Sequence, residues 1–442
     1  MIKYIAHITI ELTTPLRVGS NRSDMFQDSP VQRDFNDLPM ILGTTITGVL
    51  RDRFRDVFAD KEDDFFGFSD FKNKDSYGSK LRVTNGLLCD ENQKVSEDLL
   101  LNKSVFLKQF DNLPLREHTA ITDDGSVKEH SKFDEEIIFK GARFKFELEL
   151  DGDGKEHIQW HNILHIINSD DFRFGGGSTK GFGAFRVVEL KHRVLNLKEE
   201  SDLQEYIEKN PSLNDKNFRW SDFDYGEQNL VKSKFIKYIC DIKPDDFFIF
   251  GSGYGDDEAD NTPKTESIIV WEDSKAKFSE SEILIPASSI KGAIAHRVAY
   301  HYNLQNSLFI GDEKAKVGED NEAVKVIFGE KKDTKTKQGQ KGKILIGDCF
   351  ENITDRKIFD HVAIDRFSGG AIDGALFQEK VVSSEKSFKI EILLQDDIAD
   401  KFSNPFEQAL KDIVDGMLPL GGMGTKGHGF FSGDCFKNGV KI

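Results

Sequence analysis

The chain opens with alternating hydrophobic and polar residues, a pattern typical of a half-buried β-strand. The alternation covers residues 2–18 and ends at the polar stretch that follows Gly19. Residues 49–55 then have the spacing of a helix, and the threonines just before them suit its N-terminal cap. A second strand over 144–150, a second helix over 157–168 and a glycine-rich segment follow. Strands and helices mixed in this irregular order predict an α+β domain with an antiparallel sheet.

The same order of elements returns in the second half of the chain. Residues 44–48 align with 288–292, and residues 144–148 align with 388–392, each at an offset of 244 (288 − 44 and 388 − 144). The two glycine-rich segments align at nearly the same offset. Because chance similarities of short motifs would scatter the offsets, the sequence predicts a tandem duplication. The expected units are a first domain, an interdomain connection and a second domain, over residues 1–190, 191–237 and 238–442.

Composition limits the class of protein. The 442 residues include 60 Lys and Arg against 77 Asp and Glu, a formal net charge of −17. Phosphate binding needs Lys and Arg, so any nucleic-acid surface must be local. No apolar run is long enough to span a bilayer, and the N-terminus lacks the features of a signal peptide. The four cysteines are far apart and form no CxxC pair, which favours a reducing cytoplasm over disulfides or a zinc cluster.

Each glycine-rich segment carries one lysine and runs into a strand. Glycine allows positive φ and lets a ligand approach backbone N–H groups closely, and lysine adds a charge for phosphate. A single segment of this kind is most simply a tight turn. Two copies in matching context favour contact with a phosphodiester backbone, through Gly177, Thr179, Lys180, Gly424, Thr425 and Lys426.

The two hydroxyl-rich helix starts offer a second place for phosphate. Side-chain oxygens and free N–H groups at a helix N-terminus bind anions, although Ser and Thr also cap helices in every kind of protein. Neither segment has the GxxxxGK[ST] spacing of a P-loop. The candidate phosphate-binding residues here are Thr44, Thr45, Arg51, Arg53, Ser288, Ser289, Lys291 and Arg297.

Asp28 lies in the polar stretch just before the first of these helices. A carboxylate beside a phosphate-binding surface is electrostatically unfavourable unless it holds a metal or a proton, which indicates chemistry at this position. Asp-Ser-Pro is also an ordinary turn sequence. The residue is therefore either a catalytic, metal-binding carboxylate or a turn residue.

Together these motifs resemble the RAMP superfamily of CRISPR-associated proteins. The matching elements are the helix starts at 42–48 and 285–292 and the two glycine-rich segments. Residues 364–377 look especially like the backbone subunit of type III effector complexes. The sequence is most similar to a fused, two-domain version of that subunit, as in type III-D-like complexes. The resemblance implies two tandem ferredoxin-like (RRM-like) cores with inserted thumb hairpins.

The resemblance also implies a function. Such subunits bind the backbone of the guide RNA (crRNA) in a multisubunit complex with other CRISPR effector proteins, and they cleave target RNA. The catalytic aspartate of the family falls on Asp28, with a divalent metal, expected to be Mg²⁺, as cofactor. The adjacent 2′-hydroxyl of the target would attack and displace the 5′-oxygen. We therefore expect a cytoplasmic, RNA-guided endoribonuclease with no membrane partner.

The second copy departs from the family pattern in the loop that carries this aspartate. Its candidate catalytic residues are Asp260 and Glu266, and whether this copy cleaves or only binds is open. Thr47 replaces the lysine of the first helix start. Two alternative functions also stay open. One is a non-catalytic RNA-binding scaffold subunit of the same complex, and the other is a guide-RNA processing endonuclease, whose family lacks the helix start seen at 288–292.

Overall fold

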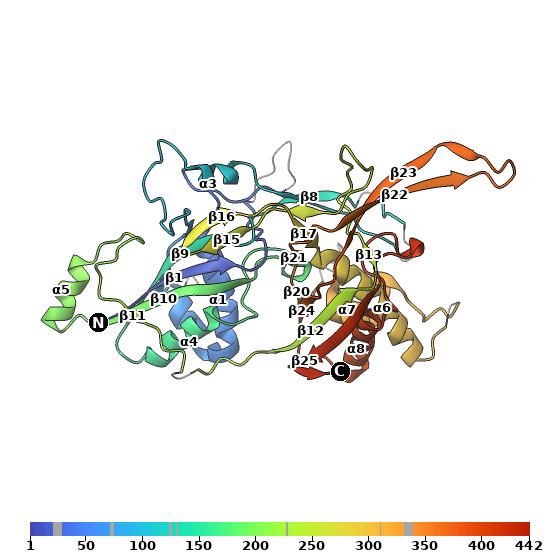
Figure 1. Ribbon diagram of the computed structural model, residues 1–442. Coiled ribbons are helices and arrows are strands. Elements are labelled where there is room, and N and C mark those ends of the chain that lie inside the picture. Colours follow the sequence, from blue (N-terminus) through green and yellow to red (C-terminus); the bar gives the residue numbers. More distant parts are fainter. Residues whose placement is uncertain are drawn as a thin grey trace.

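The chain folds into two halves that lie side by side, each built from a sheet and helices (Figure 1). The structure is a computed structural model. It describes residues 1–20, 29–70, 75–122, 126–129, 131–226, 229–309, 311–330 and 339–442. None of the helices within these ranges has the length and apolar character needed to cross a bilayer.

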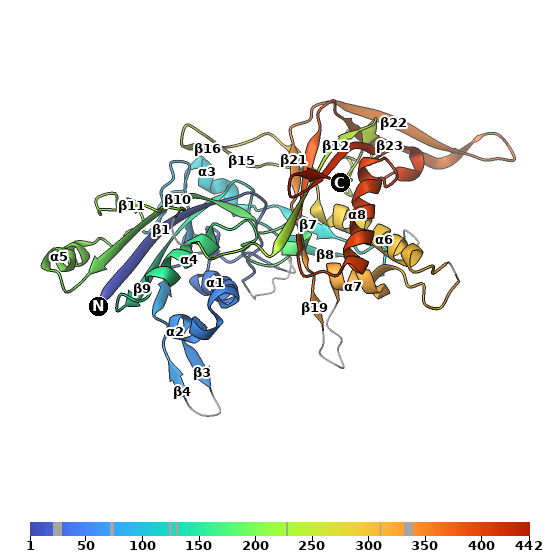
Figure 2. The ribbon, with the colours of Figure 1, turned by 90° about the horizontal axis from the view of Figure 1, so that it is seen from below.

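The sheet of the first half is antiparallel, with the first strand of the chain in its middle. Two helices cover one face of this sheet, α1 (Gly43–Phe58) and α4 (His157–Ile167) (Figures 1 and 2). The strands run in the order β11 (Ser221–Asp222), β10 (Phe185–Asn196), β1 (Ile2–Leu12), β9 (Arg143–Gly152), β6 (Gly86–Leu88) and β2 (Met40–Ile41), and β5 (Leu81–Val83) also pairs with β9.

The hydrophobic pattern explains why the helices pack on that face. Alternate residues of β1 are apolar and buried, from Tyr4 to Leu12, and they meet alternate apolar residues of β9. On α1 the buried side chains recur every four residues, at Ile46, Leu50 and Phe54. Four-residue spacing puts them on one helix face, so that face and the sheet close around a single core.

The sheet of the second half repeats this arrangement. Its helices are α6 (Ala287–Gln305) and α8 (Asp400–Val414). The strands run in the order β20 (Ile344–Ile346), β24 (Phe388–Gln395), β12 (Phe235–Pro244), β25 (Phe431–Lys437) and β26 (Val440–Lys441). The four main strands are β1, β6, β9 and β10 in the first half and β12, β20, β24 and β25 in the second. Numbered in chain order within each half, they lie in the order fourth, first, third, second in both sheets. The two halves therefore have one topology, as the tandem duplication predicts.

Each half also carries an inserted hairpin after the second strand of its sheet. In the first half this is β7 (Leu115–His118) with β8 (Phe133–Glu136), which turns toward the second half. In the second half it is the longer pair β22 (Arg356–Ile364) and β23 (Ala371–Ser383), which projects away from the molecule (Figure 1). We call these the first hairpin and the second hairpin.

A third hairpin joins the halves. Strands β15 (Ile269–Glu272) and β16 (Lys275–Phe278) follow the first strand of the second half but pack on the first half. The indole Nε1 of Trp271 donates to the carbonyl oxygen of Gly141 at 2.8 Å. The ring of Phe278 contacts aromatic rings of the first core, those of Phe106, Phe110 and Phe139. The two halves therefore share an apolar contact as well as a polar one.

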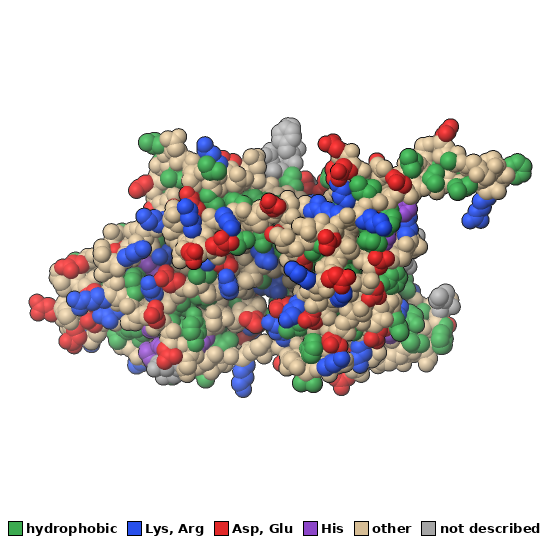
Figure 3. All heavy atoms as spheres, in the orientation of Figure 1, with side chains coloured by type: hydrophobic (Ala, Val, Ile, Leu, Met, Phe, Trp, Pro, Cys, Tyr) green, Lys and Arg blue, Asp and Glu red, His purple; other side chains and the backbone are tan. Residues whose placement is uncertain are grey.

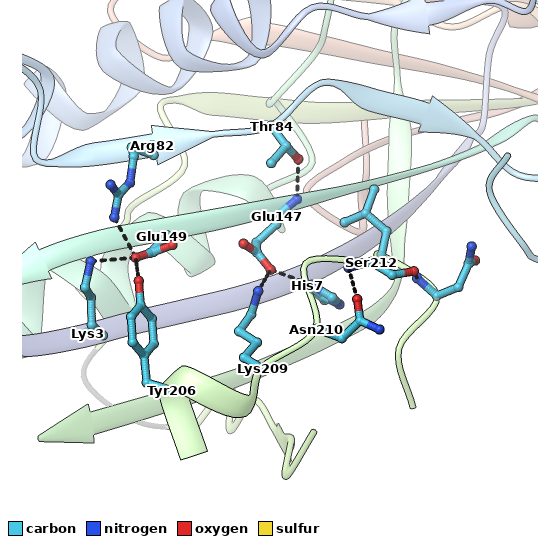
Figure 4. Close-up of polar contacts among 12 residues, drawn as sticks. Lys3, His7, Arg82, Thr84, Glu147, Glu149, Tyr206, Lys209, Asn210 and Ser212 are labelled. Atoms are coloured by element: carbon cyan, nitrogen blue, oxygen red, sulfur yellow. Dashed lines mark hydrogen bonds and ion pairs between the residues drawn. The ribbon is translucent and has the colours of Figure 1, made fainter. Parts of the chain in front are cut away.

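The segment between the halves folds back onto the outer face of the first sheet. It contains α5 (Glu200–Glu208). Glu149 of β9 accepts hydrogen bonds from Lys3 at 2.7 Å and from the hydroxyl of Tyr206 at 2.8 Å (Figure 4). Its neighbour on the same face, Glu147, is 2.7 Å from both His7 and Lys209. These two carboxylates therefore hold the interdomain connection on the first sheet.

The remaining elements are short. The helical ones are α2 (Glu62–Phe66), α3 (Val105–Lys108), α7 (Glu322–Phe328) and the 3₁₀ turns at Ala59–Lys61, Gln109–Asp111, Ser178–Lys180, Gly318–Asp320 and Gly424–Lys426. The strands are β3 (Phe68–Asp70), β4 (Asp75–Tyr77), β13 (Phe247–Phe248), β14 (Thr265–Glu266), β17 (Glu282–Ile285), β18 (Gly329–Glu330), β19 (Gln340–Lys341) and β21 (Cys349–Glu351).

Candidate functional site

Both helix starts that the sequence singles out lack the hydroxyl caps expected for them. Helix α1 begins at Gly43, whose N–H donates to Asn85 Oδ1 at 2.8 Å. Helix α6 begins at Ala287, whose N–H donates to Asp348 Oδ1 at 2.8 Å. The expected caps are therefore wrong, because a neighbouring loop supplies the acceptor and both helices begin ahead of the residues proposed for that role, Thr44, Thr45, Ser288 and Ser289.

The first glycine-rich segment lies against the start of α6, across the boundary between the halves. Gly181 has a φ of 105°, and a Cβ at this position would lie 2.5 Å from Asp348 Oδ1 and 2.7 Å from the Cβ of Ala287. Only glycine fits this approach and this backbone conformation. We call this contact, between residues 175–183 and the start of α6, the interdomain seam.

Two of the predicted lysines meet at the interdomain seam. Lys291 of α6 reaches across to Thr179, with its Nζ 3.3 Å from the hydroxyl oxygen. Burial, and then repulsion from Lys180, lower the pKa of Lys291 to about 8. Burial also lowers the pKa of Lys180, although Glu135 opposes the shift. Within the described residues no carboxylate lies within ion-pair distance of Lys291. The seam therefore holds positive charge that lacks a full counterion.

A carboxylate at the base of the first hairpin lies beside these lysines. Glu135 is buried and pairs with Arg17 at 2.8 Å, with His118 at 3.2 Å and with Lys180 at 3.9 Å. Burial acts to raise its pKa, but hydrogen bonding to His118 and the nearby cations lower it overall. Arg17 also donates to the hydroxyl oxygen of Ser29 at 3.0 Å. This group therefore links the glycine-rich segment, the first hairpin and the loop that carries the predicted aspartate.

A buried ion pair holds the seam together. Arg116 of the first hairpin donates to Glu266 Oε2 at 2.8 Å and lies 3.2 Å from Asp348 Oδ2. All three side chains are less than a tenth exposed. Glu266, one of the two catalytic candidates of the second copy, is therefore engaged in a structural pair between the halves.

The other candidate of the second copy, Asp260, occupies the position that corresponds to Asp28. Isolated bridges at the same point of both loops fix the register, Gly19 with Val31 and Gly251 with Pro263. Counting three residues back from the second partner of each bridge gives Asp28 and Asp260. Asp28 lies outside the described residues. Asp260 is exposed, and its Oδ2 accepts from the N–H of Gln378 on the second hairpin at 2.8 Å.

The predicted arginines on the helices already have carboxylate partners. These are Glu62 and Asp63 for Arg51, Asp56 and Asp171 for Arg53, and Asp412 for Arg297. An arginine that neutralises a carboxylate in its own domain has less charge to offer a phosphate. Contact of these residues with RNA stays a prediction, and the seam lysines have the stronger claim.

The second glycine-rich segment has the same shape as the first, but its counterpart of Gly181 is not covered by the other half. Among the described residues, a Cβ at Gly427 would meet no atom within 4 Å. Thr425 and Lys426 are exposed, Gly424 is half-buried, and the Nζ of Lys426 lies 3.9 Å from the ring centre of Phe377 on the second hairpin. In the first half, Lys180 lies 4.4 Å from the ring centre of Phe133. The lysine–aromatic contact is therefore duplicated along with the segment.

Histidine–carboxylate pairs were not visible in the sequence. His118 stacks on Phe133 with an angle of 22° between the rings, and His361 stacks on Phe377 at the same angle. His361 Nε2 is 2.5 Å from Glu379 Oε1, as His118 is paired with the carboxylate of its own hairpin. Each histidine lies on one hairpin strand and its partner on the other, so only the strand register could have revealed the pair.

The charge on the surface agrees with a local rather than a general anion site. Figure 3 shows acidic and basic side chains intermixed over this face of the molecule. A cleft of about 610 Å³ between the halves is also mixed in charge. Its charged lining residues are Lys140, Asp170, Arg173, Arg186, Lys237, Asp348, Glu351, Lys389 and Glu391. Among the described residues, no group of three or more His, Cys, Asp or Glu side chains is arranged to hold a metal ion.

Two stretches of the chain, residues 9–186 and 248–432, match the RAMP superfamily. The chain belongs to the RAMP superfamily. The matched stretches cover both halves and leave out the connection, residues 191–237, which agrees with the duplicated topology. No curated protein matches the sequence. Membership of the RAMP superfamily favours a CRISPR-associated, RNA-binding protein.

Proposed function

We propose that this RAMP protein is a guide-RNA-binding backbone subunit of a type III CRISPR effector complex, of the fused, type III-D-like kind. The observation that supports it best is the pair of half-buried lysines at the interdomain seam, Lys180 and Lys291. Two ammonium groups brought together without a full counterion are stabilised by an anion between them. A phosphate of an RNA backbone supplies that charge and is recognised independently of sequence.

The fold supports the same proposal. The strand order of both sheets and the two helices on one face support the ferredoxin-like (RRM-like) domain that the resemblance implies. The projecting second hairpin supports the inserted thumb hairpin that the resemblance implies, and hydrophobic side chains lie along it (Figure 3). Leu376 and Phe367 are exposed there, and Phe367 is at the tip. Exposed apolar and aromatic groups on an arm of this kind suit contact with RNA bases or with another subunit of a cytoplasmic complex.

The binding test compares the seam lysines with an ordinary surface lysine. The double change Lys180→Ala and Lys291→Ala is made in the complex that carries its RNA, and Lys401→Ala, an exposed lysine of α8 paired with Glu322, serves as control. Salt dependence of RNA binding is measured for each. We expect the logarithmic salt slope to fall by about 0.7 for each lost contact with single-stranded RNA, and no change for Lys401→Ala. An unchanged slope for the double variant contradicts binding at the seam.

We further propose that the first half cleaves target RNA, with Asp28 as the catalytic carboxylate and a divalent cation such as Mg²⁺ as cofactor. Such a cation would neutralise charge on the reacting phosphate. The support is indirect: Ser29, next to Asp28 in the chain, is hydrogen-bonded to Arg17 beside Lys180. The target 2′-hydroxyl would attack the phosphorus and displace the 5′-oxygen.

The cleavage test compares the two corresponding aspartates. Asp28→Ala is expected to abolish metal-dependent cleavage at the positions served by the first half. Asp260→Ala is expected to leave cleavage intact, because Asp260 is bonded to the second hairpin and Glu266 is held by Arg116. If Asp28→Ala still gives metal-dependent cleavage at every position, the first half is structural, as in the non-catalytic scaffold hypothesis.

A further inference from the structure

The second half carries a group of side chains with the composition of an RNA-cleaving site. We call it the histidine cluster: His361, Phe377 and Glu379 of the second hairpin, with Lys426 and His428 of the second glycine-rich segment. Both histidines have their Nε2 near one carboxylate oxygen, Glu379 Oε1, at 2.5 Å for His361 and 3.2 Å for His428. Glu379 is fully buried.

The corresponding group in the first half has a structural explanation. There the buried Glu135 is neutralised by Arg17 and Lys180 as well as by its histidine. His118 is only 11% exposed, and the seam covers this side of the molecule. The pairing of histidine with carboxylate fixes the base of the hairpin against the glycine-rich segment.

That explanation leaves three features of the second half unaccounted for. By the loop register that relates the two halves, Ile249 stands where Arg17 stands in the first, so the cation beside the carboxylate is lost. Glu135 Oε2 and Glu379 Oε2 are both buried without a hydrogen bond among the described residues, but Glu135 Oε2 lies 3.2 Å from His118, whereas no described ion pair reaches Glu379 Oε2. His361 is 27% exposed, and Lys426, which also packs on the Phe377 ring, has no carboxylate within ion-pair distance in the described part of the chain.

The carboxylate decides which nitrogen of His361 can act. Because Nε2 donates to Glu379, the proton of the neutral ring is held there, and Nδ1 has the free lone pair. A carboxylate that fixes the tautomer of a histidine and stabilises its charged form is the arrangement by which histidine becomes an effective base. Lys426 adds a cation on the ring that also carries the histidine, where it can stabilise negative charge on a phosphate.

We propose that the histidine cluster is a second RNA-cleaving centre, one that acts on single-stranded RNA by acid–base catalysis without a metal. The proposal rests on the proposed function, since the RNA must already lie along the protein. His361 Nδ1 takes the proton of a ribose 2′-hydroxyl, and the 2′-oxygen forms a bond to the adjacent phosphorus. The bond from phosphorus to the 5′-oxygen breaks, and that oxygen takes a proton from Lys426. The products are a 2′,3′-cyclic phosphate and a 5′-hydroxyl, and solvent returns the proton from His361 to Lys426.

In this proposal His361 and Lys426 are the catalytic residues, and Glu379 and His428 are positioning residues. His428 is buried, and within the described residues its side chain bonds to Glu379. Changing Glu379→Gln should therefore lower kcat and leave KM for RNA unchanged. A merely structural role of Glu379 would change thermal stability and RNA binding together instead.

The experiment uses the full-length protein with the Asp28→Ala change, an end-labelled single-stranded RNA, and EDTA in the buffer. We expect slow cleavage that gives 2′,3′-cyclic phosphate ends and that stops when the nucleotide before the break is 2′-deoxy. His361→Ala should lower the rate at least a hundredfold, with partial recovery in added imidazole. His296→Ala, an exposed histidine of α6, is the matched control and should cleave like the parent.

The outcomes separate this inference from the proposed function. RNA that binds but is not cut in EDTA overturns the histidine cluster as a catalytic centre and leaves guide binding intact. The same conclusion follows if His361→Ala cuts at the rate of the parent. RNA that does not bind the assembled complex contradicts the proposed function itself.

Discussion

The two glycine-rich segments have nearly the same sequence and the same backbone shape, yet their surroundings differ. The first is covered by the start of α6, so closely that Gly181 has no room for a Cβ. At the corresponding Gly427 of the second segment, an added Cβ would have no described atom within 4 Å. Duplication thus produced one segment that joins two domains and one that faces outward. The chemistry available to each segment follows from what covers it.

The residues beside each segment have changed with this difference. In the first hairpin, Arg116 reaches the second half and forms the buried pair with Glu266. At the same place of the second hairpin stands Phe359, whose ring stacks with His428 at 5.7 Å. The base of the first hairpin therefore forms part of the interface between the halves. The base of the second hairpin instead carries aromatic and histidine side chains.

The largest effect on stability is expected from removing the buried arginine of the seam, Arg116. Arg116→Met would leave Glu266 and Asp348 buried without their partner, at a cost of about 3–5 kcal/mol in the free energy of unfolding. Phe359→Met at the corresponding position keeps an apolar side chain and should cost less than about 1.5 kcal/mol. Urea unfolding followed by circular dichroism measures both. Similar losses for the two variants would show that the halves do not depend on the buried pair.

The glycines provide a second contrast of the same kind. In Gly181→Ala the alanine must adopt a left-handed backbone conformation, and its Cβ clashes with Asp348 and Ala287. The two effects together should lower the free energy of unfolding by about 2–4 kcal/mol. Gly427→Ala should cost only about 1 kcal/mol, because its φ of 89° is unfavourable for alanine but the space is free. Thermal unfolding of the two variants gives the comparison. Equal shifts in Tm would mean that the first segment is not closely packed.

The sequence predicted the duplication and the order of elements because both depend on local pattern. The strand expected at 144–150 is found as β9 and the helix expected at 157–168 as α4, and residues 388–392, which align with 144–148, lie in β24. Apolar residues at two-residue and four-residue spacing carry that information within each element. The family likewise followed from short motifs, and the match over both halves agrees with it.

The site was harder to predict because it depends on contacts between distant residues. The pairing of Lys291 with Thr179 joins two halves of the chain, and no spacing within either motif indicates it. The hydroxyl caps were wrong for the same reason, since Asn85 and Asp348 lie in other loops. Glu266 was proposed as a catalytic residue because Glu266-Ser267 could stand in the second copy where Asp28-Ser29 stands in the first, but its buried partner is Arg116.

The titration of Lys291 allows the seam to be tested by pH. Its lowered pKa, about 8, means that the charged form present below that pH is lost as the pH rises through it. A bound phosphate favours the charged form, so RNA affinity should fall by up to about tenfold between pH 7 and pH 9. Lys291→Arg stays charged over this range and should show a smaller change. An equal pH dependence in the two proteins contradicts phosphate binding by Lys291.

The smallest effect concerns the outer faces of the two sheets. Glu147 and Glu391 correspond, but Glu147 is nearly buried and bonded to His7 and Lys209, whereas Glu391 is mostly exposed. Burial acts to raise the pKa of Glu147, but its two partners lower it overall. A carboxyl whose pKa is lowered on folding stabilises the protein above its unfolded pKa of about 4.3, and this stability is lost as the pH falls through the folded value. Glu147→Gln should therefore cost about 1 kcal/mol at pH 7 and less at pH 3, while Glu391→Gln should cost little at either pH. Urea unfolding at the two pH values tests this. If Glu147→Gln lowers the free energy of unfolding as much at pH 3 as at pH 7, the ionised carboxylate of Glu147 does not hold the connection on the sheet.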